Sequence, residues 1–154
     1  MRMIIYGAGA IGGTLGSRLH LAGFDVLLIA RGAHADAIRA QGLRYCNPES
    51  EMTQPIPCVN HPDRIIFQPD DAVLLTVKPQ DTLQALTDLA RVAPSSIRVF
   101  CAQNGVRNEA LALRFFKHVY GMLVLCPGTH LTPGEVINSA ANPGGLFDTG
   151  CYPQ

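Results

Sequence analysis

Five short apolar runs recur along the chain, each long enough for one β-strand. Because nearly every residue in them is apolar, they are typical of strands buried on both faces of a parallel sheet. After the first run, Ile11, Leu15 and Leu19 recur at helical spacing, and Gly23 is suited to end that helix in the left-handed conformation. The apolar runs are residues 3–6, 25–30, 72–77, 97–102 and 119–125.

Further helices are predicted between these runs at residues 35–42, 82–90 and 108–116. Strands that alternate with helices indicate an α/β fold, built on a doubly wound, Rossmann-like parallel sheet. We interpret residues 1–154 as one domain of this class. Because no long helical region follows the last run, we expect the helical second domain that such enzymes usually carry to be absent from this chain.

Two regions depart from the alternation. Residues 46–70 contain five prolines, which favour loop or sheet-edge structure, with a short strand near Val59. Beyond Pro127 the tail has two short apolar pieces, residues 135–137 and 145–147. We predict that these two pieces form a short β-hairpin at the C-terminal edge of the sheet.

The composition of the chain argues against nucleic acid, membranes and metal ions as partners. The 12 basic and 12 acidic residues balance, which gives no overall attraction to nucleic acid or to an anionic membrane. No apolar run approaches the roughly 20 residues that span a bilayer. The five cysteines form no Cys-x-x-Cys pair and the histidines show no metal-ligand spacing, so we expect a cytoplasmic protein without a metal site.

A glycine-rich turn follows the first strand and opens the first helix. It matches the G-x-G-x-x-G pattern, in which the first glycine makes the turn, the second admits a pyrophosphate and the third lets helix and sheet approach. Free N–H groups at the helix start would then face the anion. A turn without a ligand and a methyltransferase-type nucleotide site are the alternatives. The residues of the turn are Gly7, Ala8, Gly9, Ala10, Ile11 and Gly12.

Arg31 follows the second strand, where domains that bind NAD usually carry an acidic residue for the ribose 2′-hydroxyl. A guanidinium at this place would instead offer forked, charge-assisted hydrogen bonds to a 2′-phosphate. The sequence therefore favours NADP(H) as cofactor, with a solvated loop arginine as the alternative. His34, three positions later, either supports the loop around the phosphate or is an ordinary surface histidine.

Two further polar residues follow later strands. Lys78 comes directly after the run 72–77, and Asn104 follows the run 97–102. Since open α/β sheets bind ligands at the carboxyl ends of strands, Lys78 can meet a cofactor phosphate or ribose, and Asn104 a nicotinamide ribose or a substrate oxygen. Each also has a plainer interpretation, as a strand-end lysine and as the asparagine of an Asn-Gly turn.

Several segments, taken in order, resemble the N-terminal domain of the ketopantoate reductases (2-dehydropantoate 2-reductases). They are IIYGAGAIGG, ARGAHADAIRAQGL, AVLLTVKPQDT, CAQNGVRNE, and PGEVINS with the later GGLFDTGCYP. The glycine turn is generic, whereas R-G-x-H, V-K-x-x-D-T and Q-N-G together are much more specific. The resemblance extends over nearly the whole chain.

The resemblance implies an oxidoreductase of pantothenate biosynthesis that uses NADPH to reduce 2-dehydropantoate, or a similar 2-keto acid, to the 2-hydroxy acid. In that family the residues matching Arg31 and Lys78 contact the cofactor, and the asparagine matching Asn104 touches cofactor and substrate. The family's proton-donating lysine lies in a helical C-terminal domain, so the resemblance implies no catalytic residue in this chain. We expect NADP(H) binding with little turnover, and a homodimer formed through apolar surface at the domain join.

Two other functions stay open. Another two-domain hydroxy-acid dehydrogenase would share the fold and the glycine turn, although the Q-N-G segment argues against it. A stand-alone module that binds or senses NADP(H) without catalysis would also fit. A substrate panel with a full-length protein would test the first alternative, and a reading frame that continues into helices would argue against the second.

Overall fold

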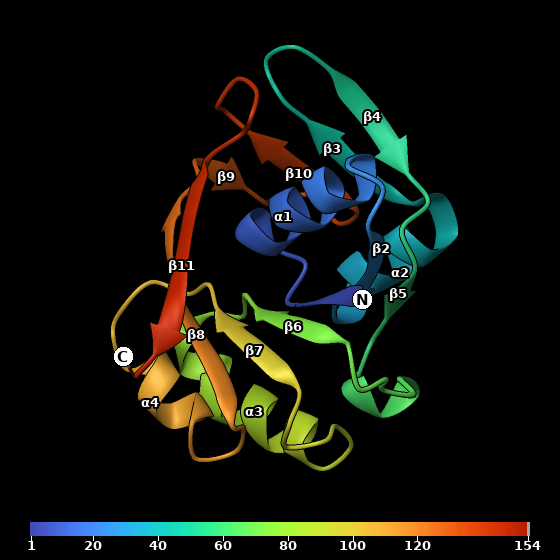
Figure 1. The fold of residues 1–154 in the computed structure, drawn as a ribbon. Coiled ribbons are helices and arrows are strands. Elements are labelled where there is room, and N and C mark those ends of the chain that lie inside the picture. Colours follow the sequence, from blue (N-terminus) through green and yellow to red (C-terminus); the bar gives the residue numbers. More distant parts are fainter. Residues whose placement is uncertain (154) are drawn as a thin grey trace.

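A computed structural model of the chain describes residues 1–153. Its main sheet has seven strands, which are β1 (Arg2–Tyr6), β2 (Asp25–Ile29), β5 (Cys58–Val59), β6 (Ala72–Leu75), β7 (Arg98–Cys101), β8 (His118–Leu125) and β11 (Leu146–Tyr152). Their order across the sheet is β11-β8-β7-β6-β1-β2-β5 (Figure 1). Neighbouring strands are parallel except for β11, which runs antiparallel to β8.

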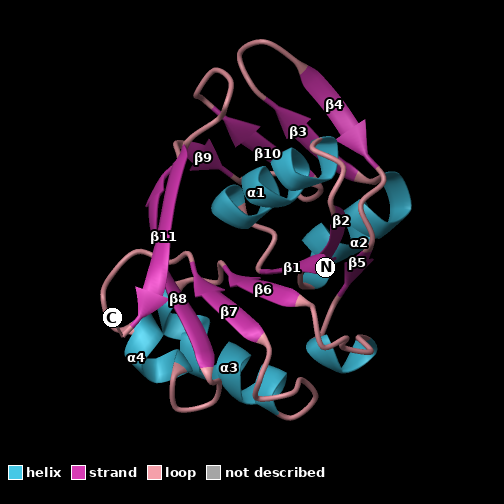
Figure 2. Ribbon diagram, in the orientation of Figure 1, coloured by secondary structure: helices cyan, strands magenta, loops and turns pink. Residues whose placement is uncertain are grey.

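Helices cover both faces of this sheet (Figure 2). Side chains alternate along β1, so that Ile4 packs with Leu86 on one face and Ile5 packs with Leu15 on the other. Burial on both faces explains why the strands are uninterrupted apolar runs. The helices are α1 (Ala10–Leu21), α2 (Gly32–Gln41), α3 (Thr82–Ala90) and α4 (Asn108–Ala112).

A second, smaller sheet packs against α1 (Figure 1). Tyr45 and Val136 of this sheet are fully buried, in the same apolar cluster as Leu15 of α1. A Cβ atom on Gly13 would come within 2.5 Å of Cγ2 of Val136, so α1 is tightly held between the two sheets. The order of the small sheet is β4 (Glu51–Gln54), β3 (Leu43–Cys46), β10 (Glu135–Asn138) and β9 (Gly128–Thr129).

The predicted doubly wound α/β fold is confirmed. The five apolar runs form β1, β2, β6, β7 and β8, the helix predicted at 82–90 is α3, and the strand predicted near Val59 is β5. α2 begins earlier than predicted, at Gly32, because Arg31 is extended and serves as its N-cap. α4 ends at Ala112, earlier than predicted, and the chain then turns so that Phe116 is buried in the core.

The predicted hairpin at the C-terminal edge is wrong. β10 pairs in parallel with β3 of the small sheet, whereas β11 pairs antiparallel with β8 of the main sheet. The two pieces separate because Val136 of β10 is buried against α1, while each residue of β11 has a pairing partner in β8. β3 and β4 are missing from the prediction because only alternate residues of β3 are buried, which leaves no continuous apolar run.

Candidate functional site

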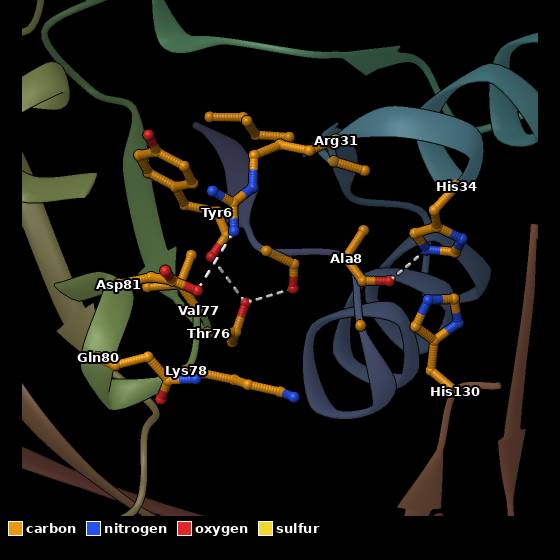
Figure 3. A pocket seen from close by; sticks show the side chains of 14 residues that line it. Tyr6, Ala8, Arg31, His34, Thr76, Val77, Lys78, Gln80, Asp81 and His130 are labelled. Carbon is orange, nitrogen blue, oxygen red and sulfur yellow. Dashed lines mark hydrogen bonds and ion pairs between the residues drawn. The ribbon is translucent and has the colours of Figure 1, made fainter. Parts of the chain in front are cut away.

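A cleft opens at the carboxyl ends of β1, β2 and β6, where the strand order of the main sheet reverses. Its volume is about 420 Å³. The walls come from the segments that follow these strands, together with His34 of α2 and His130 between β9 and β10 (Figure 3). This is the place at which open α/β sheets generally bind ligands.

The structure brings most of the predicted site residues together. Those on the cleft wall are Gly7, Ala8, Gly9, Arg31 and Lys78. Ala10, Ile11 and Gly12 form the first turn of α1, directly after the wall residues. Asn104 lies in the loop after β7 and is not among the residues that line the cleft.

The three glycines of the turn have different surroundings. Gly7 has a φ of +110°, and a Cβ on it would lie 2.8 Å from the backbone nitrogen of Val77. A Cβ on Gly12 would lie 2.0 Å from the carbonyl oxygen of Gly7. At Gly9, in contrast, a Cβ would have no atom within 4 Å. Packing therefore requires glycine at the first and third positions, whereas the second leaves open space that a phosphate group can use.

The start of α1 is suited to an anion. Gly9 is its N-cap residue, no side chain caps the helix, and the first turn contains no acidic residue. The first N–H groups of a helix have no partner within the helix, and the helix dipole adds partial positive charge there. Backbone N–H groups at the edge of the cleft are therefore available to a phosphate.

Thr76 stabilises the glycine turn, and the sequence did not single it out. Its Oγ1 lies 3.0 Å from the carbonyl oxygen of Tyr6 and 2.8 Å from that of Gly7, so the single hydroxyl hydrogen is shared between these two acceptors. In the sequence Thr76 is one more β-branched residue at a strand end, so no signal marks it.

Tyr6, at the end of β1, also lines the cleft. Burial raises the pKa of Tyr6 to about 12, with the Asp88 carboxylate acting in the same direction, so this phenol stays protonated at neutral pH.

Arg31 reaches across the cleft to Asp81 (Figure 3). Its Nη2 lies 3.2 Å from Oδ2 of Asp81, and the two side chains are 72% and 37% exposed. Arg31 joins β2 to α2, while Asp81 ends a 3-10 turn, Pro79–Asp81, that follows β6. A smaller cavity of about 160 Å³ adjoins this ion pair on the side of His61. The predicted arginine therefore faces the cleft, but with an acidic partner that the sequence did not indicate.

His34 connects the glycine turn to the small sheet. Its Nδ1 accepts a hydrogen bond from the backbone N–H of Gly134 at 2.8 Å, and its Nε2 lies 2.7 Å from the carbonyl oxygen of Ala8. Because Nδ1 is an acceptor, the neutral ring carries its hydrogen on Nε2 and donates it to Ala8. The interpretation of His34 as an ordinary surface residue is therefore wrong, and the support of the loop is its observed role.

A second imidazole packs against this one. The rings of His34 and His130 have their centroids 4.0 Å apart, and Nδ1 of His130 lies 2.8 Å from the carbonyl oxygen of Glu135. Burial lowers the pKa of His34, and the neighbouring His130 lowers it further, against the opposing effect of the hydrogen bond to Ala8. Burial also lowers the pKa of His130. Both rings are therefore neutral at pH 7.

A buried hydrogen-bond network holds the loop that carries Asn104. Nε2 of Gln103 donates to Oγ1 of Thr82 at 2.7 Å, and Oγ1 of Thr82 donates to Oδ1 of Asn108 at 3.1 Å. Nδ2 of Asn108 donates to the carbonyl oxygen of Asn104 at 3.4 Å. The side chains of Gln103, Thr82 and Asn108 are at most 6% exposed. Residues of the V-K-x-x-D-T and Q-N-G motifs thus meet in one network, whose structural role the sequence did not reveal.

Other kinds of site find little support. Among residues 1–153, no group of three or more His, Cys, Asp or Glu side chains is placed to hold a metal ion. Within the same range, no helix has the length and apolar character needed to cross a membrane. The five cysteines are free, and burial raises the pKa of the Cys101 thiol to about 12, which suppresses thiolate chemistry there.

Comparison with known proteins finds a family whose model matches nearly the whole chain. A family model described as "Ketopantoate reductase PanE/ApbA" matches residues 3–153. The 2-dehydropantoate 2-reductase of Mesorhizobium japonicum is 34% identical over 157 residues, which cover 99% of this chain and 45% of that protein. The chain spans about half the length of the curated relatives it matches, or less.

Solved structures share the fold. A PanE/ApbA family ketopantoate reductase from Ralstonia eutropha superposes with a TM-score of 0.85 at 30% identity, over 91% of this chain and 47% of that one. D-mandelate dehydrogenase with NADH and anilino(oxo)acetate superposes with a TM-score of 0.86 at 26% identity, over 97% of this chain and 48% of that one. The chain is thus similar to about half of each of these proteins.

Proposed function

Because the chain belongs to the ketopantoate reductase family PanE/ApbA, we propose that its cleft binds NADP(H). The observation that carries the proposal is an open glycine turn next to the Arg31 guanidinium, on neighbouring strand ends. The turn suits a pyrophosphate, and the guanidinium suits a 2′-phosphate on the adenosine ribose. A nicotinamide cofactor is also what the structural neighbour D-mandelate dehydrogenase contains, in the form of NADH.

The residues of the cleft fit such a cofactor. The space at Gly9 and the uncapped start of α1 would hold the pyrophosphate. Lys78, in the segment after β6, would contact a phosphate or a ribose hydroxyl. Asn104 lies outside the cleft lining, and we assign it to the nicotinamide ribose and the substrate from the family resemblance. When bound, the nicotinamide would supply the hydride for reduction of a carbonyl group.

The names of the curated relatives favour one reaction, the reduction of 2-dehydropantoate or a similar 2-keto acid to the 2-hydroxy acid, in pantothenate biosynthesis. Within it, this chain would supply the cofactor-binding half. We assign no residue of the chain as proton donor, because Lys78 matches the lysine that contacts the cofactor in the family. Hydride transfer needs a positioned keto acid and a proton for the developing alkoxide, so we expect this chain alone to bind NADPH with little turnover.

A second candidate is the cofactor-binding half of an NADH-dependent hydroxy-acid dehydrogenase. Asp81 favours it, because its carboxylate lines the cleft beside Arg31 and can accept a hydrogen bond from a ribose 2′-hydroxyl. The similarity to D-mandelate dehydrogenase points the same way. The two candidates predict opposite cofactor preferences, which a binding measurement separates.

Titration calorimetry with NADPH and NADH tests the proposal. Arg31→Ala should weaken NADPH binding by about 1.5–3 kcal/mol, the scale of a hydrogen bond to a charged group, and should barely change NADH binding. Arg39→Ala is the matched control, because Arg39 is an exposed arginine of α2 that pairs with Asp36 outside the cleft. An equal loss for both cofactors, or a similar loss in the control, would overturn the assignment.

A further inference from the structure

We propose that Asp81 sets how strongly the cleft prefers NADPH over NADH, because its carboxylate competes with a cofactor 2′-phosphate for Arg31. This inference rests on the proposed function, in which Arg31 is the residue that recognises the 2′-phosphate. It adds a second residue on the opposite wall, which acts against that recognition. Asp81 would thus be a specificity-determining residue.

The position of Asp81 carries the inference. Its Oδ2 lies 3.2 Å from Nη2 of Arg31, and both residues line both the main cleft and the smaller cavity beside it. Figure 3 shows the two side chains pointing toward each other from opposite walls. A phosphate that approaches the guanidinium therefore also approaches the carboxylate.

The carboxylate of Asp81 points into the cleft, although the start of α3 offers it a closer hydrogen-bond partner. Asp81 is the N-cap residue of α3, a position at which an aspartate side chain commonly accepts a hydrogen bond from the helix backbone. No such hydrogen bond is present here. Its backbone is held, since its N–H donates to the carbonyl oxygen of Lys78 at 2.8 Å. The turn thus presents the side chain to Arg31 rather than to the helix.

The charges determine the direction of the effect. A 2′-phosphate carries close to two negative charges at neutral pH, so a neighbouring carboxylate repels it and also occupies the guanidinium. A ribose 2′-hydroxyl is neutral and can donate a hydrogen bond to a carboxylate. Asp81 therefore disfavours NADPH and tolerates or supports NADH. D-mandelate dehydrogenase with NADH shares this fold, so the fold itself does not exclude NADH and side chains must discriminate against it.

Asp81→Asn tests the inference, because it removes the charge and preserves the shape of the side chain. Dissociation constants for NADPH and NADH are measured by calorimetry on the wild-type chain, on Asp81→Asn and on Arg31→Ala, at low and at high salt. Asp36→Asn is the matched control, because it removes an exposed carboxylate of α2 that lies outside the cleft. Asp81→Ser provides a second uncharged side chain, and circular dichroism verifies that each variant is folded.

We expect Asp81→Asn to bind NADPH about two- to fivefold more tightly than the wild-type chain, a range typical of partly exposed charge pairs. NADH should bind equally well or more weakly, the gain for NADPH should shrink at high salt, and the control should change neither constant. Unchanged or weaker NADPH binding in Asp81→Asn, while Arg31→Ala still loses NADPH selectively, would overturn this inference alone. A wild-type chain that binds neither cofactor would overturn the proposed function and the inference with it.

Discussion

The two sheets of this molecule are assembled differently. In the main sheet, β1, β2, β6, β7 and β8 are apolar runs, each separated from the next by a helix, and between β2 and β6 the chain also forms β3, β4 and β5. In the small sheet, β3 pairs with β10, which lies far along the chain; Arg44 and Glu135, paired in this register, are 91 positions apart. Only one face of the small sheet is buried, against α1.

The difference determines what a sequence can reveal. A strand buried on both faces leaves a continuous apolar run, which is visible without knowledge of its neighbours. A short strand buried on one face leaves a weak alternation, and its partner is unknown until the chain folds. The candidate site nevertheless spans both regions, because His34 joins the glycine turn of the main sheet to Gly134 of the small one.

The largest expected effect is on the packing of the main sheet. Gly12→Ala would place a Cβ 2.0 Å from the carbonyl oxygen of Gly7, so backbone must move, and we expect a loss of about 3 kcal/mol or more in the free energy of unfolding. Urea denaturation of the variant measures it. Gly9→Ala is the control: its Cβ has open space, so stability should hold while NADPH affinity falls. Equal stability of the two variants would contradict the distinct roles of these glycines.

The contact between α1 and the small sheet should give the next effect. Val136→Ala empties a fully buried position and should cost about 2 kcal/mol of unfolding free energy. Gly13→Ala places a Cβ 2.5 Å from Cγ2 of Val136 and should cost about 1–3 kcal/mol through overpacking. In the double variant the shorter side chain at 136 relieves the clash, so the two costs should not add. Additive costs in a double-mutant cycle would mean that α1 and β10 are not in direct contact.

A smaller effect is expected at His34, the link between the two regions. His34→Phe keeps a ring beside His130 but leaves the Ala8 carbonyl and the Gly134 N–H without their partner, which should cost about 1–3 kcal/mol. NADPH affinity should also fall, because the peptide before Gly9 loses its anchor. His34→Gln retains an amide donor and should recover part of the affinity. Calorimetry that finds affinity unchanged in His34→Phe would limit this residue to a structural role.

The pH dependence of stability gives a second test of the role of His34. The pKa of His34 is lowered in the folded chain, chiefly by burial, so the unfolded chain binds a proton more readily. The contribution of His34 to the free energy of unfolding is therefore complete above its ordinary pKa of about 6.5, and is lost as the pH falls below that value toward the lowered pKa. Urea midpoints between pH 7.5 and 5 should decline less steeply in His34→Gln than in the wild-type chain. Since burial also lowers the pKa of His130, the urea midpoint of the variant should still decline somewhat as the pH falls.

The candidate site likewise contains residues that the sequence reveals and residues that it does not. Arg31, Lys78 and the glycine turn could be predicted because their places follow from strand ends that are near in sequence and visible as apolar runs. Asp81 was noticed only as a letter of V-K-x-x-D-T, because its pairing with Arg31 spans 50 positions and depends on the register of β1, β2 and β6. Thr76 gives no sequence signal at all. Contacts between residues far apart in sequence could not be predicted, because, as for β3 and β4, the partner is unknown until the chain folds.

The proposed function requires that the glycine-turn cleft holds NADP(H) and that Arg31 recognises the 2′-phosphate. Amide and arginine side-chain NMR spectra of the ¹⁵N-labelled chain, recorded during titration with NADPH and with NADH, test it most directly. We predict that both cofactors shift the backbone signals of Gly7, Gly9 and Lys78, whereas only NADPH strongly shifts the Nε signal of Arg31. Shifts confined to other surfaces, or an Arg31 signal that responds equally to both cofactors, would contradict the claim.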